Sequence, residues 1–550
     1  MTSAAPLKWH DLLRPIRVEP GKPLQVVVQR ETIPIVFVPG IMGSRLKKDG
    51  QTVWDPDDRG FMFWKYGIVK VDAAAKKAAL IGNDFAPGDM VPVADDADHN
   101  KRFAEVDAQT PPEWPTAAER GWGTVSWRTY GEVLMKLQAA GTFPPTLRAC
   151  FDFPVYAVGY NWAASNVDSG AELATRIGEI VDHHHSKDGL CKKVIVVTHS
   201  MGGLVARWAI EKEAGVKDSV LGVVHGVQPV IGAAAAYWRM KAGFERTKKW
   251  GFEFPSPSAW VLGTNGEEVT ALLAWMPGGL QLLPGPDYTD NGGSKKWLRL
   301  CDHEGKEQAS YGDDAYEQIY KNEDPKAYWR LINKAYLLPE EEPAVTPAVA
   351  WQKFCSRVNL AKKLHEALSG KAHPETQAFY GSGKKHPSCD RVEYRAVVYN
   401  WWAATKDAVT IGKVVRFIVA PGIGSAVSVG FEIIKRTEWW QSRGGFKARV
   451  ETDKGTIDVE LQHPADVAKR DKDPHGAGAG DGTVPESSGK ALKQRGDAVG
   501  GEKEAQAIEG IEHEPAYHSH GEGPAEDPIA FTVQAVKNLC RGMIKKARST

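Results

Sequence analysis

A serine stands at a sharp corner of the chain, in the stretch KKVIVVTHSMGGLVARW at positions 192–208. The β-branched run before Ser200 predicts a buried strand, and the stretch after the glycine pair predicts a helix. A small–x–Ser–x–Gly pattern between a strand and a helix is typical of a nucleophile elbow, which exposes a hydroxyl at the end of a sheet. A serine that merely caps the helix is the alternative, but the flanking strand and helix favour the elbow. The pattern predicts nucleophilic attack on a carbonyl carbon.

A serine hydroxyl is a weak nucleophile, so it needs a base beside it and an acid that orients the base. Around such an elbow the order along the chain is Ser, then Asp or Glu, then His. Asp481, in the glycine-rich stretch GAGDGTVP, is the predicted acid, although an ordinary Asp-Gly turn would also explain it. His513, directly after the last apolar strand, is the predicted base, and His518 and His520 are alternatives. His225 precedes Asp481 and fits the order poorly.

The oxyanion formed by the attack requires two backbone N–H donors. The residue after the nucleophile, Met201, is expected to supply one of them. The other is expected from the loop PGIMGS, where Ile41 is the first choice and Met42 the second. Gly40 and Gly43 would let this backbone approach the substrate closely. An ordinary turn at the end of a strand would also explain the loop taken alone.

Strands alternate with helices along the chain, which predicts a mostly parallel sheet with helices on both faces. The predicted strands are 33–38, 154–162, 193–197, 219–226, 375–381 and 505–511. The predicted helices near them are 170–185, 202–213 and 526–547. Together with the elbow, this alternation predicts an α/β-hydrolase fold.

The rest of the chain is expected to form large cap or lid insertions over the carboxyl ends of the strands, where open α/β sheets bind ligands. The predicted parts are a first part of the core (1–227), a mostly helical cap or lid (228–374), a core strand (375–389), a second insertion (390–475) and the last part of the core (476–550). The stretch FKARVETDKGTIDVEL at 446–461, within the second insertion, predicts a hairpin.

Two apolar stretches are candidates for contact with a substrate or a membrane. The segment FIVAPGIGSAVSVGF at 417–431 is too short, and too interrupted by Pro421, to span a bilayer. It would line an acyl tunnel or touch a membrane as a lid, or else be an ordinary buried segment. The stretch WDPDDRGFMFW at 54–64 would be part of a lid, or a surface loop above one aromatic cluster.

Composition excludes several classes of protein. Lys+Arg and Asp+Glu number 69 each, so no basic field would attract a nucleic acid. The six cysteines lack CxxC spacing, which argues against a zinc site and a dense disulfide framework, although a single disulfide stays open. The run His183–His185 and the acidic stretches at 54–58 and 95–98 lack the spacing of metal ligands. No cofactor and no metal are predicted.

The stretch at 1–20 has no apolar core, so no secretory signal is predicted. No run of 18 apolar residues predicts a spanning helix. The chain is expected in the cytoplasm of the cell that makes it, with export left open by a route that needs no cleaved signal.

Several motifs follow one another along the chain: PGIMGSRL (39–46), YNW (160–162), HSMGG (199–203), MPGGLQLLP (276–284), YGSG (380–383), GDGTVP (480–485) and GIEH (510–513). Together they resemble the lecithin:cholesterol acyltransferase and phospholipid:diacylglycerol acyltransferase family. The resemblance implies an α/β hydrolase with a mobile lid and acyl transfer from glycerophospholipids. It implies Ser200 as nucleophile, Asp481 as acid, and His513 rather than His518 as base, with Ile41 and Met201 as oxyanion donors.

The chain departs from that family in lacking a signal peptide and in its long insertion at 390–475. The acyl acceptor and the lipid surface are therefore open. The absence of a signal also resembles the antibacterial lipase effectors of type VI secretion, which would imply delivery to a target cell and an immunity protein or a secretion-machinery partner.

The expected function is hydrolysis of lipid acyl esters by a phospholipase or lipase that contacts a membrane surface transiently. The first alternative is a carboxylesterase or acyltransferase for neutral lipids or small esters. A non-catalytic binding protein on a hydrolase scaffold is a third, and the intact set of Ser, Asp and His argues against it. A large cap favours lipids, because a small ester needs none.

Overall fold

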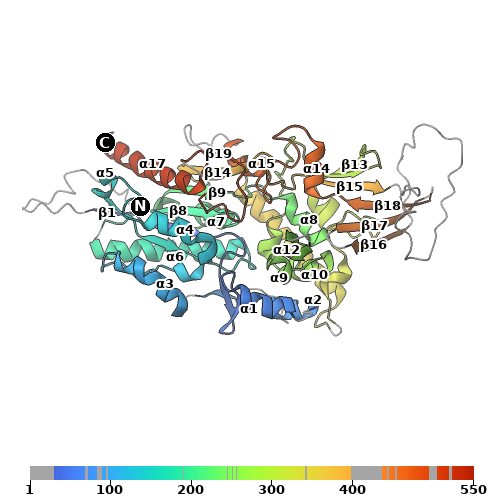
Figure 1. The fold of residues 1–550 in the computed structure, drawn as a ribbon, viewed down its shortest axis with the longest axis horizontal. Coiled ribbons are helices and arrows are strands. Elements are labelled where there is room, and N and C mark those ends of the chain that lie inside the picture. The colour runs from blue at the N-terminus through green and yellow to red at the C-terminus, as the bar shows by residue number, and fades with distance from the viewer. Residues whose placement is uncertain are drawn as a thin grey trace, which may run out of the picture.

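The computed structural model describes residues 30–68, 72–82, 90–93, 97–188, 190–244, 246–249, 252–255, 257–340, 343–397, 436–442, 445–452, 455–494, 505–519 and 523–549. The molecule is elongated, with one lobe around the nucleophile strand and a second lobe beside it (Figure 1). The segment 417–431 and His520 lie outside the described residues.

The first lobe is built on a six-stranded sheet in the order β19-β14-β9-β8-β2-β7. Every neighbouring pair in it is parallel. Its strands are β2 (Ile35–Val38), β7 (Val155–Ala157), β8 (Val194–His199), β9 (Val220–Gly226), β14 (Thr376–Ser382) and β19 (Ala505–Glu509). All residues of β8 are buried, as expected of a parallel strand covered on both faces. The predicted α/β-hydrolase fold is confirmed.

Side chains on opposite faces of the sheet enter separate hydrophobic clusters. In β2, Val36 and Val38 pack with residues of α6 and α7, whereas Ile35 and Phe37 pack with residues of α4 and α17. This division follows from the alternation of side chains along a strand. The covering helices are α3 (Ala97–Ala108), α4 (Trp127–Gln138), α5 (Pro145–Arg148), α6 (Asn166–Asp188), α7 (Gly202–Lys212) and α17 (Pro528–Ser549).

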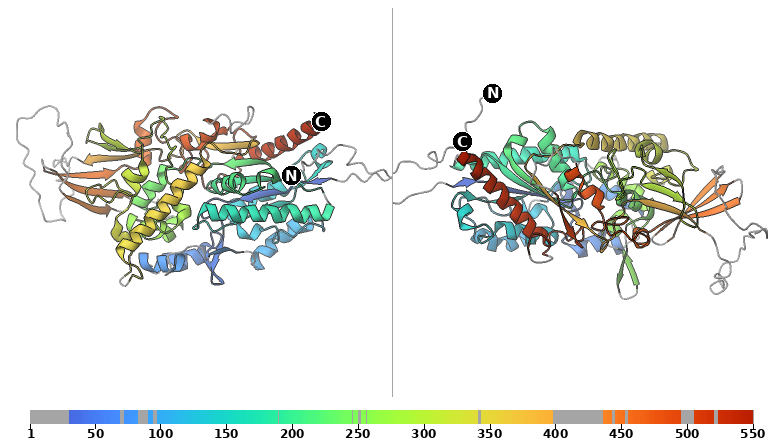
Figure 2. Two further views of the ribbon diagram at one scale, coloured as in Figure 1. Left: turned by 180° about the vertical axis from the view of Figure 1, so that it is seen from behind. Right: turned by 90° about the horizontal axis from the view of Figure 1, so that it is seen from above.

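The second lobe combines helices with a second six-stranded sheet, ordered β13-β12-β15-β18-β17-β16 (Figure 2). Its helices are α8 (Ala234–Ala242), α9 (Pro257–Leu262), α10 (Gly266–Leu273), α11 (Pro277–Leu280) and α12 (Pro347–Leu368). Its strands are β12 (Leu298–Cys301), β13 (Glu307–Tyr311), β15 (Val392–Val397), β16 (Arg436–Ser442), β17 (Gly445–Thr452) and β18 (Gly455–Leu461). The chain enters this lobe from the carboxyl ends of β9 and β14.

The hairpin expected at 446–461 corresponds to β17 and β18, which pair antiparallel. The sequence did not predict β12 and β13, which are short and lack a clear alternating pattern. Because β12 pairs with β15, the two predicted insertions share one sheet. Pairing with the distant β15, rather than local propensity, fixes β12, and β13 pairs with β12 as the outer strand of a hairpin.

Part of the first 227 residues also reaches the second lobe. Strands β3 (Leu46–Lys48) and β4 (Gln51–Trp54) lead into α1 (Arg59–Phe63), a π-helical turn (Trp64–Ile68) and α2 (Ala73–Leu80). The chain then returns as β5 (Val91–Pro92), which completes a small three-stranded sheet with β3 and β4. The buried Lys76 of α2 forms an ion pair of 3.2 Å with Glu268 of α10. Figure 1 shows α1 and α2 beneath the helices of the second lobe.

The remaining strands and α-helices are short. They are β1 (Glu31–Thr32), β6 (Phe151–Asp152), β10 (Arg246–Lys249), β11 (Phe252–Pro255), α14 (Pro464–Arg470), α15 (Glu486–Gly489) and α16 (Ala491–Gln494). The six cysteines are free thiols. Among the described helices, none combines the length and apolar character needed to cross a bilayer.

Candidate active site

Three side chains from distant parts of the chain form one hydrogen-bonded line. Nε2 of His513 lies 2.8 Å from Oγ of Ser200, and Nδ1 of His513 lies 2.8 Å from Oδ2 of Asp481. Ser200 follows β8 and His513 follows β19, so two of them extend from the carboxyl ends of core strands. The structure thus brings together the residues predicted as nucleophile, base and acid.

The turn at Ser200 has the strained backbone of an elbow. Ser200 has φ +51°, in the left-handed region that non-glycine residues rarely adopt. Its N–H donates to the Gly226 carbonyl oxygen at 2.9 Å, which fixes the turn to β9. A Cβ atom at Gly202 would lie 2.3 Å from the Pro39 oxygen, so this position, two residues after Ser200 in the elbow, admits no side chain. The strain lifts the serine hydroxyl away from the strand.

Thr198 occupies the outer position of the elbow where glycine is commoner. Its Oγ1 lies 2.8 Å from Nδ1 of His225 on the adjacent strand β9. Both residues are buried, and burial, assisted by the charge of Arg207, lowers the pKa of His225 to about 3. His225 is therefore a neutral partner of Thr198 and does not contact Ser200.

The carboxylate of Asp481 is fully buried and receives several hydrogen bonds. Oδ1 accepts from the backbone N–H groups of Thr483 at 3.0 Å and Val484 at 2.7 Å. Oδ2 is left for the imidazole of His513, whose backbone N–H also donates to the Asp481 carbonyl oxygen at 2.8 Å. These contacts set both the backbone and the ring of His513 relative to the acid.

His518, the alternative base, is half-buried and has a different partner from the serine. Its Nε2 is 3.1 Å from the Arg128 carbonyl oxygen. Ser200 itself is 4% exposed, and the side chain of His513 is 12% exposed. Charges that develop here are shielded from bulk water, which strengthens their interaction with nearby dipoles.

The loop after β2 offers two candidate oxyanion donors. The N–H of Gly40 donates to Oη of Tyr130 at 3.0 Å, and the N–H of Gly43 donates to the Gly40 oxygen at 3.1 Å. Within the described part of the chain, no group accepts a hydrogen bond from the N–H of Ile41, Met42 or Met201. The N–H groups of Ile41 and Met42 in this loop, and of Met201 after Ser200, are therefore available as candidate donors to an oxyanion.

The stretch at 54–64 makes structural contacts with this loop and with α4. Nε1 of Trp54 donates to the Met42 carbonyl oxygen at 2.8 Å. Asp55 pairs with Arg45 at 2.7 Å, and Asp57 accepts from the N–H of Trp127, at 2.7 Å, at the start of α4. Two of its aspartates are thus committed to structural contacts, and no cluster of metal ligands occurs among the described residues.

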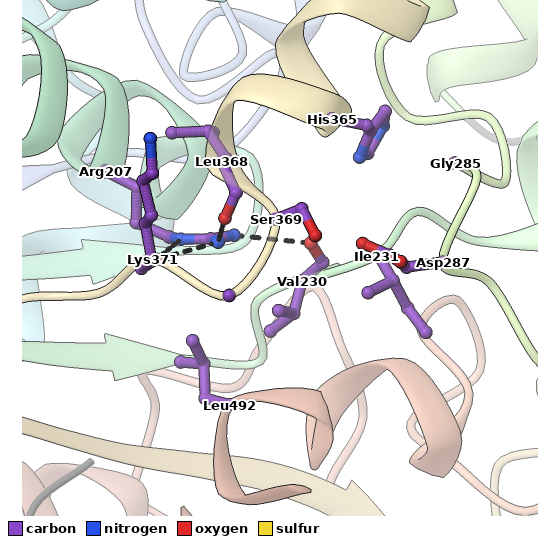
Figure 3. A pocket seen from close by; sticks show the side chains of 11 residues that line it. Arg207, Val230, Ile231, Gly285, Asp287, His365, Leu368, Ser369, Lys371 and Leu492 are labelled. Atoms are coloured by element: carbon purple, nitrogen blue, oxygen red, sulfur yellow. Dashed lines mark hydrogen bonds between the residues drawn. The ribbon is translucent and has the colours of Figure 1, made fainter. Parts of the chain in front are cut away.

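Arg207 of α7 ties the helix after Ser200 to the second lobe. Its guanidinium donates to the carbonyl oxygens of Leu368 and Lys371, at the end of α12, and of Val230 (Figure 3). Cations commonly bind such unpaired carbonyls at helix ends. The neighbouring cavity, about 20 Å³, is large enough for one water molecule and too small for an acyl chain. Arg207 is therefore a structural brace.

A parallel sheet, a strained elbow and a Ser-His-Asp line define the chain as an α/β-hydrolase-fold protein. A family model described as a PGAP1-like alpha/beta domain matches residues 151–249. That segment includes the elbow. The lecithin:cholesterol acyltransferase resemblance is not specifically shown by this match and stays a prediction.

The chain is also similar to a chain of the Tle4–Tli4 complex, solved by crystallography. The two share 25% identity with a TM-score of 0.64, covering 93% of this chain and 99% of the other. Phospholipase PlaB from Legionella pneumophila matches at 10% identity over 65% of this chain and 89% of the other. Its TM-score of 0.16 is too low to support an argument. No curated protein matches the chain.

Proposed function

We propose that this protein is a serine-dependent lipid acyl-ester hydrolase, a phospholipase or lipase, which acts through Ser200, His513 and Asp481. The observation that carries the proposal is the continuous hydrogen-bonded line from Oγ of Ser200 through the His513 ring to the Asp481 carboxylate. A base within hydrogen-bond reach of the hydroxyl, oriented by a third group, is the arrangement that activates a serine.

In the proposed reaction, His513 takes the Ser200 proton as Oγ attacks the ester carbonyl carbon. Asp481 orients the imidazole and stabilises its positive charge. The oxyanion accepts hydrogen bonds from the N–H groups of Met201 and Ile41, with Met42 as the second choice for the latter. His513 then protonates the departing alcohol, and water, activated by the same histidine, releases the fatty acid from the acyl-enzyme.

A lipid substrate is supported by the size of the second lobe, which continues from the carboxyl ends of β9 and β14. Ligands of open α/β sheets bind at these ends. A small ester would need no such lobe, so a small-ester esterase is the second candidate. An acyltransferase would share the first half of the reaction and differ in the acceptor alone.

We extend the proposal to an antibacterial effector of type VI secretion, with an immunity protein as partner. The similarity to a chain of the Tle4–Tli4 complex over 93% of this chain supports a protein partner, because the matched chain is itself part of a complex. Expression of the protein in a bacterium, with its lipids extracted and resolved by mass, tests this extension. Unchanged phospholipids and unchanged growth would contradict it.

The central test compares wild type, Ser200→Ala and His518→Ala on mixed phospholipid vesicles, with products resolved by mass. Wild type and His518→Ala are expected to release fatty acid and lysolipid at equal rates. Ser200→Ala is expected to lose at least about a thousandfold in rate. Equal release by wild type and Ser200→Ala would overturn the proposal. Cleavage of short esters without any release from vesicles would favour the small-ester esterase.

A further inference from the structure

A second histidine, His199, lies buried beside the nucleophile and the base. It precedes Ser200 in the elbow, is 4% exposed, and its ring centroid lies 5.3 Å from that of His513. Nδ1 of His199 lies 3.0 Å from Oη of Tyr130, and Nε2 lies 2.9 Å from the carbonyl oxygen of His513. Both ring nitrogens therefore have partners, and neither contacts the serine hydroxyl.

The direction of each hydrogen bond in this set is determined. A carbonyl oxygen can only accept, so Nε2 of His199 donates to His513. Burial, assisted by the nearby His513, lowers the pKa of His199 to about 3, so Nδ1 carries a lone pair. Oη of Tyr130 must then donate to Nδ1, while it accepts from the N–H of Gly40 at 3.0 Å. The tautomer and the hydroxyl orientation are thus mutually consistent.

These bonds connect parts of the site that are far apart in sequence. Gly40 lies in the loop PGIMGS (39–44), which holds candidate oxyanion donors and is called the oxyanion loop below. Tyr130 belongs to α4 and His199 to the elbow. His513 belongs to the loop after β19. The connection therefore runs from the oxyanion loop to the backbone of the base. A buried polar group is costly to leave without a hydrogen-bond partner, which makes this connection stiff.

Packing makes the same connection. A Cβ atom at Gly40 would lie 2.7 Å from Nδ1 of His199, and one at Gly43 would lie 2.5 Å from Oη of Tyr130. The glycines of the oxyanion loop are thus in direct contact with the Tyr130–His199 pair. Displacement of either ring would shift the loop that must meet the oxyanion.

We propose that Tyr130 and His199 are positioning residues that hold the oxyanion loop and His513 at fixed positions relative to Ser200. The inference rests on the proposed function, since it assigns these residues to the same reaction. Neither residue takes up a proton or touches the ester. They act by fixing the distance between the oxyanion donors and the base, and a misplacement of about 1 Å can cost about a hundredfold in rate.

A second buried Tyr–His pair provides a matched control. Oη of Tyr156 lies 2.8 Å from Nε2 of His184, with ring centroids 5.9 Å apart, compared with 5.5 Å for Tyr130 and His199. Tyr156 and His184 are 2% and 3% exposed. This pair joins β7 to α6 and contacts none of the candidate catalytic residues. Removal of its hydroxyl measures the general effect of breaking a buried Tyr–His bond.

The first experiment compares Tyr130→Phe with Tyr156→Phe on a short soluble ester. Tyr130→Phe is expected to lower kcat about tenfold to a hundredfold, with KM changed less than about twofold. Tyr156→Phe is expected to keep both constants while losing a similar amount of stability in urea unfolding. Equal kcat values for the two variants would overturn the inference. A Ser200→Ala variant as active as wild type would instead overturn the proposed function.

The second experiment separates the two bonds of His199. The amide of asparagine can replace Nδ1, and that of glutamine can replace Nε2. His199→Asn should keep the Tyr130 bond and lose the His513 bond, whereas His199→Gln should do the reverse. Adding Tyr130→Phe should therefore lower kcat strongly in His199→Asn but little in His199→Gln. Identical effects in both backgrounds would contradict the connection, because coupling is expected only where both residues share a bond.

Discussion

The two six-stranded sheets of this protein differ in topology and in what they carry. In the core sheet every neighbouring pair is parallel, and Ser200 and His513 follow the carboxyl ends of β8 and β19. In the second sheet β12 and β15 pair in parallel, and the other described pairs are antiparallel. No candidate catalytic residue lies in it.

The difference shows how sheet topology places chemistry. Parallel strands end at the same edge, so loops that are distant in sequence meet there. Antiparallel strands alternate in direction, and consecutive loops leave from opposite edges. The second sheet can therefore shape and cover a site, whereas the core sheet assembles one. Asp481 belongs to the candidate site, where it contacts His513, and Asp458 belongs to the second sheet, where it contacts Arg449. Both carboxylates are buried and hydrogen-bonded, so the two residues can be compared directly.

The largest expected effect comes from exchanging these two carboxylates for amides. Asp481→Asn should lower kcat about 10⁴-fold, because the amide no longer stabilises the imidazolium or the required tautomer. Asp458→Asn removes a carboxylate that pairs with Arg449 in the second sheet and should leave kcat unchanged. Steady-state kinetics on a short ester measures both. A similar loss in the two variants would erase the functional distinction between the sheets.

An intermediate effect is expected from acid. The pKa of His225 on β9 is lowered by burial to about 3 in the folded state, below the ordinary value of 6.5. Between pH 3 and pH 6.5 the unfolded chain binds a proton at this histidine and the folded chain does not. The contribution of His225 to the free energy of unfolding is therefore complete above pH 6.5 and is lost as the pH falls toward 3. Each such histidine contributes a slope of up to about 1.4 kcal/mol per pH unit.

His225→Gln should therefore flatten the decline in stability of the core between pH 6.5 and 4. Amide hydrogen exchange in β8 and β9, corrected for the intrinsic effect of pH, provides the measurement. Strands β17 and β18 contain no histidine, so their protection should show the same pH dependence in both proteins. If wild type and variant have parallel pH dependence in β8 and β9, His225 is not the neutral buried group described above.

The smallest effect is expected in the second sheet. Nε of Arg449 lies 2.8 Å from Oδ1 of Asp458, and its side chain is 45% exposed. Partly exposed ion pairs contribute about 1 kcal/mol or less. Arg449→Ala should lower the free energy of unfolding by no more than this amount and leave kcat unchanged. A fall in kcat would show that the second sheet influences the reaction more directly than its topology indicates.

Much of the core could be predicted from sequence because its strands are continuous apolar runs. The runs at 193–197 and 219–226 became β8 and β9, and the elbow between strand and helix located Ser200. The second sheet was only partly predictable. Its hairpin alternates visibly, but β12 is defined by pairing with β15, which lies nearly a hundred residues later. Such long-range pairing leaves no local pattern.

The Tyr130–His199 pair was missed for a related reason. Tyr130 belongs to an amphipathic helix and reads as one more core aromatic. The single available signal was a histidine beside the nucleophile, and nothing in the sequence links it to a tyrosine 69 positions earlier. Hydrogen bonds between distant side chains are decided by how helices dock on the sheet.

The sequence alone determined the types and order of the reacting groups, because the elbow and its flanking elements are local patterns. It also determined the alternation that produces a parallel sheet. The sequence favoured His513, which directly follows the last apolar strand, and left His518 as an alternative. The tertiary structure decided the distances, because only folding brings Nε2 of His513 to Oγ of Ser200 and Nε2 of His518 to the Arg128 carbonyl oxygen. It likewise decided that two insertions share one sheet, since sheet pairing between distant segments is a property of the folded chain.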